Sequence, residues 1–290
     1  MQLIRILTND SGASKLVWDA GDGRSFEASA FVSRSHDASS HSAGGVVCIS
    51  SQVGCNVGCR FCANWRLSKA RNLTHNELVE QAIVARTHLP TLEQVSVTYS
   101  GMGEPLHNIR AIVSASNELC ESHGFAYASL STVGIPNGIR KLAEIRPSTH
   151  LFLSLHSTED SVRRELIPSK FCFPIKEVLL EAKVYSSITN RKVNVSYLLL
   201  PGVNDTSRNA TQLAELLDSK FFCVQVLLWN KIEGMDFKRS SRQEADCFVA
   251  RLVELGMPAF VMESSGQDIG GGCGQLADSF SAISPRTTSK

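Results

Sequence analysis

The chain has 290 residues, of which 43% are hydrophobic and 20% are charged, and its formal net charge is +1. This composition is too apolar for a disordered chain, and no apolar run is long enough to span a membrane. A net charge near zero excludes a generally basic surface, so any RNA would have to bind a local patch. The amino-terminal residues lack the pattern of a signal peptide, and we expect a cytoplasmic protein.

The amino-terminal part of the chain predicts a small appendage. Residues 1–32 alternate apolar and polar side chains around a Gly-Asp-Gly turn, which is typical of an antiparallel β element. Residues 33–45 are rich in Ser, His and Gly, and we interpret them as a linker. We expect the main domain to occupy residues 46–280, with a flexible tail at 281–290.

The main domain alternates β-rich runs with helical patterns. Helical periodicity follows Thr74, Ser207 and Gln243. Repeated βα units form parallel sheets with right-handed crossovers. The predicted fold class is therefore α/β, a partial (β/α)6 TIM-like barrel whose functional residues lie at the carboxyl ends of the strands. The six predicted strands are 46–51, 95–100, 127–132, 150–156, 193–200 and 223–229.

Three of the nine cysteines, Cys55, Cys59 and Cys62, lie within eight residues in a CxxxCxxC spacing. Such clustering suits a reducing compartment and a metal site better than a disulfide framework. A structural zinc site would need a fourth ligand. Three cysteines would instead leave one iron of a 4Fe–4S cluster without a protein ligand, as catalysis requires. A zinc knuckle, or three core cysteines, is the alternative.

This spacing, with Phe61 before the last cysteine, resembles the radical SAM superfamily, in which S-adenosyl-L-methionine (SAM) binds the open iron. Residues 101–105, Gly-Met-Gly-Glu-Pro, resemble the element that holds the SAM amino group. Polar residues also end several of the predicted strands, where a barrel places its ligand contacts. We therefore expect SAM contacts at Gly103, Glu104, Ser131, Ser154, Leu155, His156 and Asn230.

A narrower resemblance rests on two outlying cysteines, Cys48 and Cys273. Together with the motifs above they resemble the RlmN/Cfr family, which methylates an adenine carbon of RNA; the matching segments are 47–62, 70–74, 101–108, 154–156, 229–230 and 268–277. The resemblance implies that Cys273 is the cysteine methylated by a first SAM and that Cys48 resolves the enzyme–RNA adduct. It implies that Glu27 is the proton acceptor.

The resemblance also implies the chemistry. The amidine carbons of adenine are electrophilic and cannot attack a sulfonium, so a carbon radical is needed. A second SAM would be cleaved to a 5′-deoxyadenosyl radical that takes a hydrogen from methyl-Cys273, and the resulting radical would add to C2 or C8. The resemblance therefore implies two SAM molecules per turnover, an RNA partner (rRNA or tRNA) and an electron donor such as flavodoxin or ferredoxin.

The chain departs from the family pattern in three places. We expect no counterpart of the usual amino-terminal helical domain before the β element, residues 63–74 differ from the usual family sequence, and residues 264–269 stand where the family commonly has Arg-Gly before the acidic residue. Positive charge is still concentrated beside the cysteines, at Arg60, Arg66, Lys69 and Arg71. This charge fits a contact with the RNA backbone, and it fits a solvated basic loop equally well. The alternatives are a methyltransferase of a non-RNA substrate, a non-catalytic iron–sulfur relative and a structural zinc module. The oligomeric state is left open.

Overall fold

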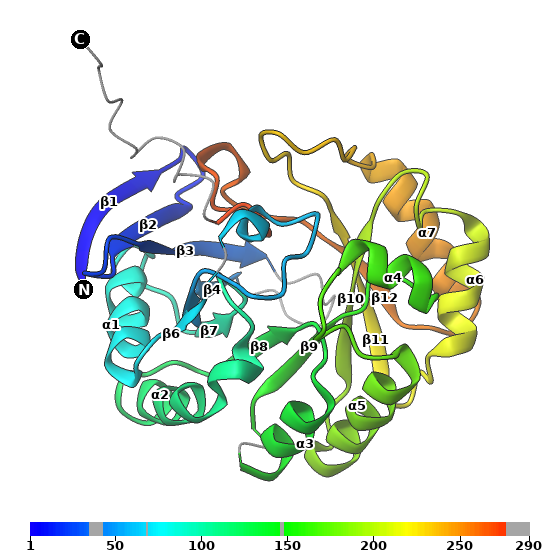
Figure 1. Cartoon of the computed structure of the whole chain (residues 1–290), viewed down its shortest axis with the longest axis horizontal. Coiled ribbons are helices and arrows are strands. Elements are labelled where there is room, and N and C mark those ends of the chain that lie inside the picture. The colour runs from blue at the N-terminus through cyan, green and yellow to red at the C-terminus, as the bar shows by residue number, and fades with distance from the viewer. Residues whose placement is uncertain (35–42, 68, 146–147, 277–290) are drawn as a thin grey trace.

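The computed structural model describes residues 1–34, 43–67, 69–145 and 148–276, and Figure 1 shows their arrangement. The predicted linker lies partly outside these residues, and the predicted tail lies entirely outside them. In the described part of the chain, no helix is both long and apolar enough to cross a membrane.

One open sheet forms the centre of the molecule. Among the described residues it contains ten strands, in the order β1-β2-β3-β4-β7-β8-β9-β10-β11-β12. The strands from β4 to β12 are parallel to their neighbours in this sheet. These seven are β4 (Ala43–Cys48), β7 (Val95–Tyr99), β8 (Ala128–Thr132), β9 (His150–Ser154), β10 (Val193–Leu199), β11 (Phe222–Leu228) and β12 (Ala259–Met262).

The α/β prediction is confirmed, and the structure adds a seventh parallel strand to the six expected. The additional strand, β12, has only four residues, which is too short for a periodic pattern to stand out. Three antiparallel strands continue the same sheet beyond β4; they are β1 (Gln2–Thr8), β2 (Ser14–Asp19) and β3 (Ser25–Arg34). A separate short pair, β5 (Gln52–Val53) and β6 (Arg71–Asn72), braces the loop after β4.

Helices cover the outer face of the curved sheet (Figure 1). Three of them begin with capping boxes, at Thr74, Thr206 and Ser241, which satisfy amide groups that have no partner inside the helix. The helices are α1 (His75–Arg86), α2 (Ile109–Ser122), α3 (Pro136–Ile145), α4 (Asp160–Leu166), α5 (Ile175–Thr189), α6 (Ser207–Leu216) and α7 (Arg242–Glu254), with 3-10 turns η1 (Ala63–Arg66), η2 (Pro105–Asn108) and η3 (Gln267–Ile269).

The antiparallel strands share the core of the barrel. Trp18 on β2 and Phe26 on β3 stack with ring centroids 5.7 Å apart. Both belong to the hydrophobic cluster that also contains Leu78 and Ala82 of α1. This packing holds β3 beside β4. The part of β3 around Glu27 therefore lies next to the end of β4.

We predict that Trp18→Ala lowers the free energy of unfolding by about 3–5 kcal/mol, because the indole is 1% exposed and its removal leaves a cavity. Trp65→Ala is the matched control, since Trp65 is 49% exposed and its removal should cost less than about 0.5 kcal/mol. Urea unfolding of the metal-free protein measures both. Equal effects of the two substitutions would show that the antiparallel strands do not share the core.

Candidate active site

The predicted site residues meet at the edge formed by the carboxyl ends of the parallel strands. Cys48 ends β4, and the three clustered cysteines lie in the loop that follows it. Glu104 follows β7, His156 follows β9, Asn230 follows β11 and Cys273 follows β12. Parallel strands direct their carboxyl ends to one side, so these loops become neighbours although up to 225 residues separate them.

The three clustered thiols lie close to one another. Burial raises the pKa of Cys55 to about 12, and repulsion from a Cys62 thiolate and from the Glu104 carboxylate adds to the rise. Burial raises the pKa of Cys59 as well, with contributions from both neighbouring cysteines. Among the described residues, no three His, Cys, Asp or Glu side chains are arranged to hold a single metal ion. In a 4Fe–4S cluster each cysteine binds a different iron, so three nearby thiols fit such a cluster with one open iron.

The loop that carries these thiols is held from several sides. The Arg60 N–H donates to the Leu166 carbonyl at 2.9 Å, and the Trp229 indole N–H donates to the Phe61 carbonyl at 3.0 Å. Phe61 also meets the ring of His156 edge to face, with centroids 4.8 Å apart. The loop is therefore anchored to the segments that follow β9 and β11.

The Cys273 loop lies directly against the cysteine loop, as Figure 1 shows for the red segment and the cyan loop after β4. The Ala63 N–H donates to the Gly274 carbonyl at 2.8 Å, and the Asn64 side chain donates to the Leu276 carbonyl at 3.2 Å. Asn230 donates to the Cys273 carbonyl at 3.0 Å and to Ser264 Oγ at 2.9 Å. Asn230, which we predicted to contact SAM, therefore positions the loop of Cys273 in this structure.

The two outlying cysteines approach each other. Burial raises the pKa of Cys48 to about 12, and the negative charge of a Cys273 thiolate adds to this rise. Burial of the Cys273 sulfur raises its pKa too, although the residue as a whole is exposed, and the Ser264 hydroxyl opposes the rise. Burial also raises the pKa of Cys62, and the negative charge of a Cys273 thiolate is a smaller cause of the same rise. All nine cysteines lie in described segments, and no disulfide joins any two of them.

Glu104 is buried and held by the chain itself. Its carboxylate accepts hydrogen bonds from Leu106 N at 3.0 Å, Thr132 Oγ1 at 2.6 Å and Val133 N at 3.0 Å. Burial raises the pKa of this carboxyl, and the three hydrogen bonds oppose the rise. An ionised carboxylate has about four acceptor positions, so Glu104 can accept one more donor, such as an ammonium group. Gly103, at φ +100°, leaves no room for a side chain, because a Cβ there would lie 2.7 Å from the Cβ and Cγ of Gln52.

The other predicted SAM contacts lie around the ends of β8 and β9. Ser131 Oγ and Ser154 Oγ are 3.3 Å apart, and Leu155 is fully buried. His156 adopts the left-handed conformation, with φ 60°, and its Nδ1 accepts from Leu198 N at 3.0 Å. Burial, together with the charge of the nearby Arg163, lowers the pKa of His156 to about 3, so the ring is neutral at physiological pH. Its proton must then reside on Nε2.

Two buried positive charges were not predicted from the sequence, and the first is Lys15. Its ammonium lies 2.9 Å from Glu27 Oε2 and donates to the Gly270 carbonyl at 3.0 Å. The side chains of Lys15 and Glu27 are 1% and 0% exposed. Nearby, Asn9 donates to Asp268 at 2.8 Å. The strand β2 therefore links Glu27 to the segment that leads into Cys273. The only sequence signal was a lysine within an otherwise apolar strand.

The second of these charges is Arg163 on α4, which is fully buried. Its guanidinium donates to the carbonyls of Leu155 and Phe173 at 3.0 and 2.9 Å, and also to that of Val133 at 2.5 Å. Its charge favours the thiolate of Cys59, although burial dominates the pKa of that cysteine. Arg163 therefore places a positive charge beside the cysteine loop.

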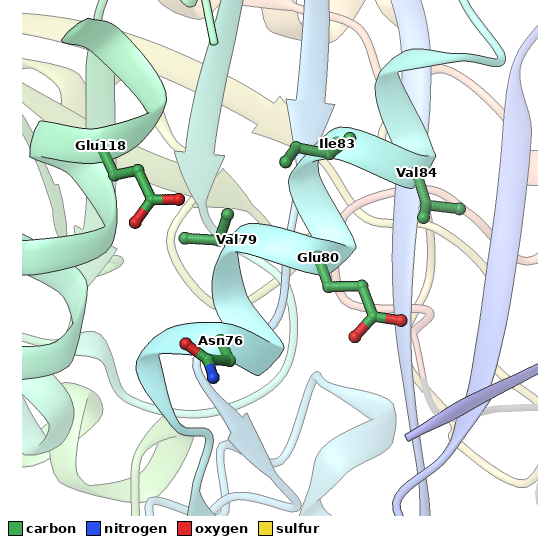
Figure 2. Close-up of a pocket in the computed structure, with 6 residues that line it drawn as sticks. All are labelled: Asn76, Val79, Glu80, Ile83, Val84 and Glu118. Carbon is green, nitrogen blue, oxygen red and sulfur yellow. The ribbon is translucent and has the colours of Figure 1, made fainter. Parts of the chain in front are cut away.

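A separate hollow lies on the outside of the molecule, between α1 and α2 (Figure 2). It has a volume of about 290 Å³ and is lined by Asn76, Val79, Glu80, Ile83, Val84 and Glu118. None of these residues belongs to the loops at the carboxyl edge of the sheet. The hollow is therefore not part of the candidate active site.

The fold and the cysteine loop point to one class of protein, and comparison with known families identifies that class. The model of the radical SAM superfamily matches residues 49–213, more than half of the chain. Members of this superfamily use a 4Fe–4S cluster and SAM. The crystal structure of a radical SAM methyltransferase from Sphaerobacter thermophilus is similar, with a TM-score of 0.85 and 33% identity, over 96% of this chain and 81% of that one.

Sequence relatives define the family more narrowly. The dual-specificity RNA methyltransferase RlmN of Helicobacter hepaticus is 34% identical over 96% of this chain and 79% of its own length. A probable dual-specificity RNA methyltransferase RlmN of Thermus thermophilus is 36% identical over 95% of this chain and 77% of its own length. The chain belongs to the RlmN family of radical SAM methyltransferases.

We predict that Cys48 reacts slowly with iodoacetamide, because a pKa of about 12 leaves about one thiol in 10⁴ ionised at pH 8. The rate should rise about tenfold from pH 7 to pH 8 and again to pH 9, since the thiolate fraction does so below the pKa. Peptide mass spectrometry of the metal-free protein measures the rate, with the exposed Cys247 as reference. Labelling of Cys48 as fast as Cys247 would contradict the burial seen here.

We predict that Lys15→Met lowers the free energy of unfolding by about 3–5 kcal/mol, because it leaves the Glu27 carboxylate buried without its ion-pair partner. The double variant Lys15→Met/Glu27→Gln should recover a large part of this decrease, since neither charge is then buried. Urea unfolding of the four proteins in the cycle gives the coupling energy. Additive effects would show that the two side chains are not coupled.

Proposed function

We propose that the protein methylates a ring carbon, C2 or C8, of an adenine in rRNA or tRNA, with Cys273 as the methyl carrier. The observation that carries the proposal is the approach of Cys48, Cys62 and Cys273 at the carboxyl edge of the sheet, where the charge of a Cys273 thiolate reaches both other thiols. The family relationship supports the same reaction, because the relatives are named as RNA methyltransferases.

The two cofactors fit the residues present. Cys55, Cys59 and Cys62 would hold the 4Fe–4S cluster, and Glu104 would accept the SAM ammonium group with Gly103, Ser131, Ser154, Leu155, His156 and Asn230 around it. When bound, the reduced cluster supplies the electron that cleaves SAM to methionine and a 5′-deoxyadenosyl radical. Arg163 adds a buried positive charge next to this anionic centre, where it favours the thiolate of Cys59.

The residues of the chain then have separate tasks. Cys273 accepts a methyl group on its sulfur and carries it to the base. The Asn230 side chain and the Ala63 N–H hold the loop in place through hydrogen bonds to its carbonyl groups. Glu27 takes the proton that the base loses, the cluster would take back the one electron that the radical adduct gives up, and Lys15 fixes the Glu27 carboxylate at the strand edge. Cys48 attacks the Cys273 sulfur, which forms a disulfide and breaks the carbon–sulfur bond to the base. The released carbon takes up a proton and leaves as the methyl group of the RNA. An external thiol reduces the disulfide.

The proposal extends to the cellular setting and to the organisation of the chain. A disulfide that must be reduced in every cycle suits the reducing cytoplasm. The electron would come from a flavodoxin or a ferredoxin. Residues 46–280 would form the catalytic core, and the β element of residues 1–32 would support the Cys273 loop through Lys15 and Asn9.

A labelling experiment tests the proposal. The anaerobically reconstituted protein would receive methyl-labelled SAM, a reductant and total RNA from cells that lack the gene, and the digested RNA would be analysed by nucleoside mass spectrometry. We expect ring-labelled methyladenosine from the wild type and none from Cys273→Ala. Cys247→Ala is the matched control, since Cys247 is also an exposed cysteine but lies on α7, and it should retain full activity.

Other outcomes separate the alternatives. If Cys273 became methylated while the RNA stayed unlabelled, the protein would be a methyltransferase of a substrate other than RNA. Bound iron without SAM cleavage would indicate a non-catalytic iron–sulfur protein. Zinc in place of iron, with no brown chromophore, would indicate a structural zinc module.

A further inference from the structure

One buried side chain lies between the cysteine loop and the loop of Cys273. Asn64, two residues after Cys62, is 5% exposed. Its Nδ2 donates to the Cys62 sulfur at 3.6 Å and to the Leu276 carbonyl at 3.2 Å. A single amide group therefore bridges one of the three clustered cysteines and the segment that carries Cys273.

The partners of this amide fix the way it points. An amide nitrogen carries two hydrogens, and a thiolate sulfur and a carbonyl oxygen both accept hydrogen bonds. The Asn64 Oδ1 is buried and has no hydrogen-bond partner within the described part of the chain. Rotating the amide by 180° would place this oxygen against the two acceptors, which would repel it. An unpaired buried oxygen costs free energy, so the asparagine is better explained by what its nitrogen does.

The backbone of Asn64 acts on the same sulfur. Burial raises the pKa of Cys62, and the backbone N–H and the side chain of Asn64 both oppose that rise because they donate to the sulfur. These two donors therefore stabilise negative charge on Cys62. Hydrogen bonds to the sulfur ligands are one of the determinants of the reduction potential of an iron–sulfur cluster.

We propose that Asn64 is a positioning residue whose amide raises the reduction potential of the cluster through Cys62 and holds the Cys273 loop against it through Leu276. This inference rests on the proposed function, in which Cys62 binds iron and Cys273 carries the methyl group. An electron from a flavodoxin or a ferredoxin increases the negative charge on the cluster and its sulfur ligands, and an N–H that points at the Cys62 sulfur stabilises that reduced form. The second hydrogen of the same amide keeps the methyl carrier near the cluster.

A redox titration of the loaded protein, followed by electron paramagnetic resonance, tests the contact with Cys62. Asn64→Leu removes the side-chain donors and the unpaired oxygen and keeps a similar volume. We expect the ratio of reduced to oxidised cluster at a fixed potential to fall about 3- to 10-fold, which is a shift of about 30–60 mV to lower potential for a one-electron couple. Asn64→Ala should shift the potential in the same direction. Iron content and urea unfolding show whether each variant is loaded and folded.

The rate at which iodoacetamide labels Cys273 tests the contact with Leu276, in both the loaded and the metal-free protein. We expect Asn64→Leu to speed this labelling about 2- to 10-fold, the range that the loss of one hydrogen bond allows. Gln275→Leu is the matched control. Gln275 holds the same loop through the Lys231 carbonyl at 3.0 Å and the Gly272 N–H at 3.1 Å, and neither contact involves a cysteine. Its replacement should speed the labelling and leave the potential unchanged.

The outcomes are distinguishable. If the wild type assembles no cluster or never methylates Cys273, the proposed function is wrong. If it does both while Asn64→Leu changes neither the potential nor the labelling, the role of Asn64 is wrong and the function stands. A change in only one of the two measurements would overturn the part that the other measurement tests.

Two further results would overturn the contact with Cys62 as the cause of the potential. An equal shift in Gln275→Leu would assign the shift to loosening of the loop. Loss of the cluster from both Asn64→Leu and Asn64→Ala would show that Asn64 is needed to hold iron, whereas a hydrogen bond that only tunes the potential is not.

Discussion

In the described part of the chain, the carboxyl ends of seven parallel strands meet at one edge of the sheet, and the candidate site depends on this geometry. The loops after β4 and β12, the first and last of these strands, become neighbours there and are joined by the hydrogen bond from Ala63 to Gly274. The loops after β7 and β9 supply Glu104 and His156 between them. Because buried strands hold the ends of every loop, the side chains are positioned by a rigid scaffold.

Burial sets the protonation states in this site. Removal from solvent raises the pKa of the cysteine thiols and lowers that of His156, so the free protein holds neutral groups where a cluster would need thiolates. Metal ligation must displace those protons, and iron loading is therefore coupled to their release. Arg163 partly compensates, since its buried charge favours an anion beside it.

The antiparallel strands also help to position the residues of the candidate site. They extend the sheet from β4 and share its core, and β2 reaches the carboxyl-terminal segment through Lys15 and Asn9. A buried ion pair is costly to form, so the Lys15–Glu27 pair is weak evidence for added stability. Its position between the strand edge and Gly270 instead suggests a structural link that keeps two parts of the site in register.

The sequence by itself determined the α/β class and the six longer parallel strands, because periodicity depends on residues a few positions apart. It also determined the cysteine motif and the family, since these are patterns of residue types along the chain. Only the tertiary structure decided that Lys15 pairs with Glu27 and contacts Gly270, that Asn230 holds the Cys273 carbonyl, and that Arg163 ends beside the cysteine loop. These contacts join residues that are far apart in sequence or lie on different elements. Which residues meet depends on how the loops cross at the sheet edge, and no local sequence pattern contains that information.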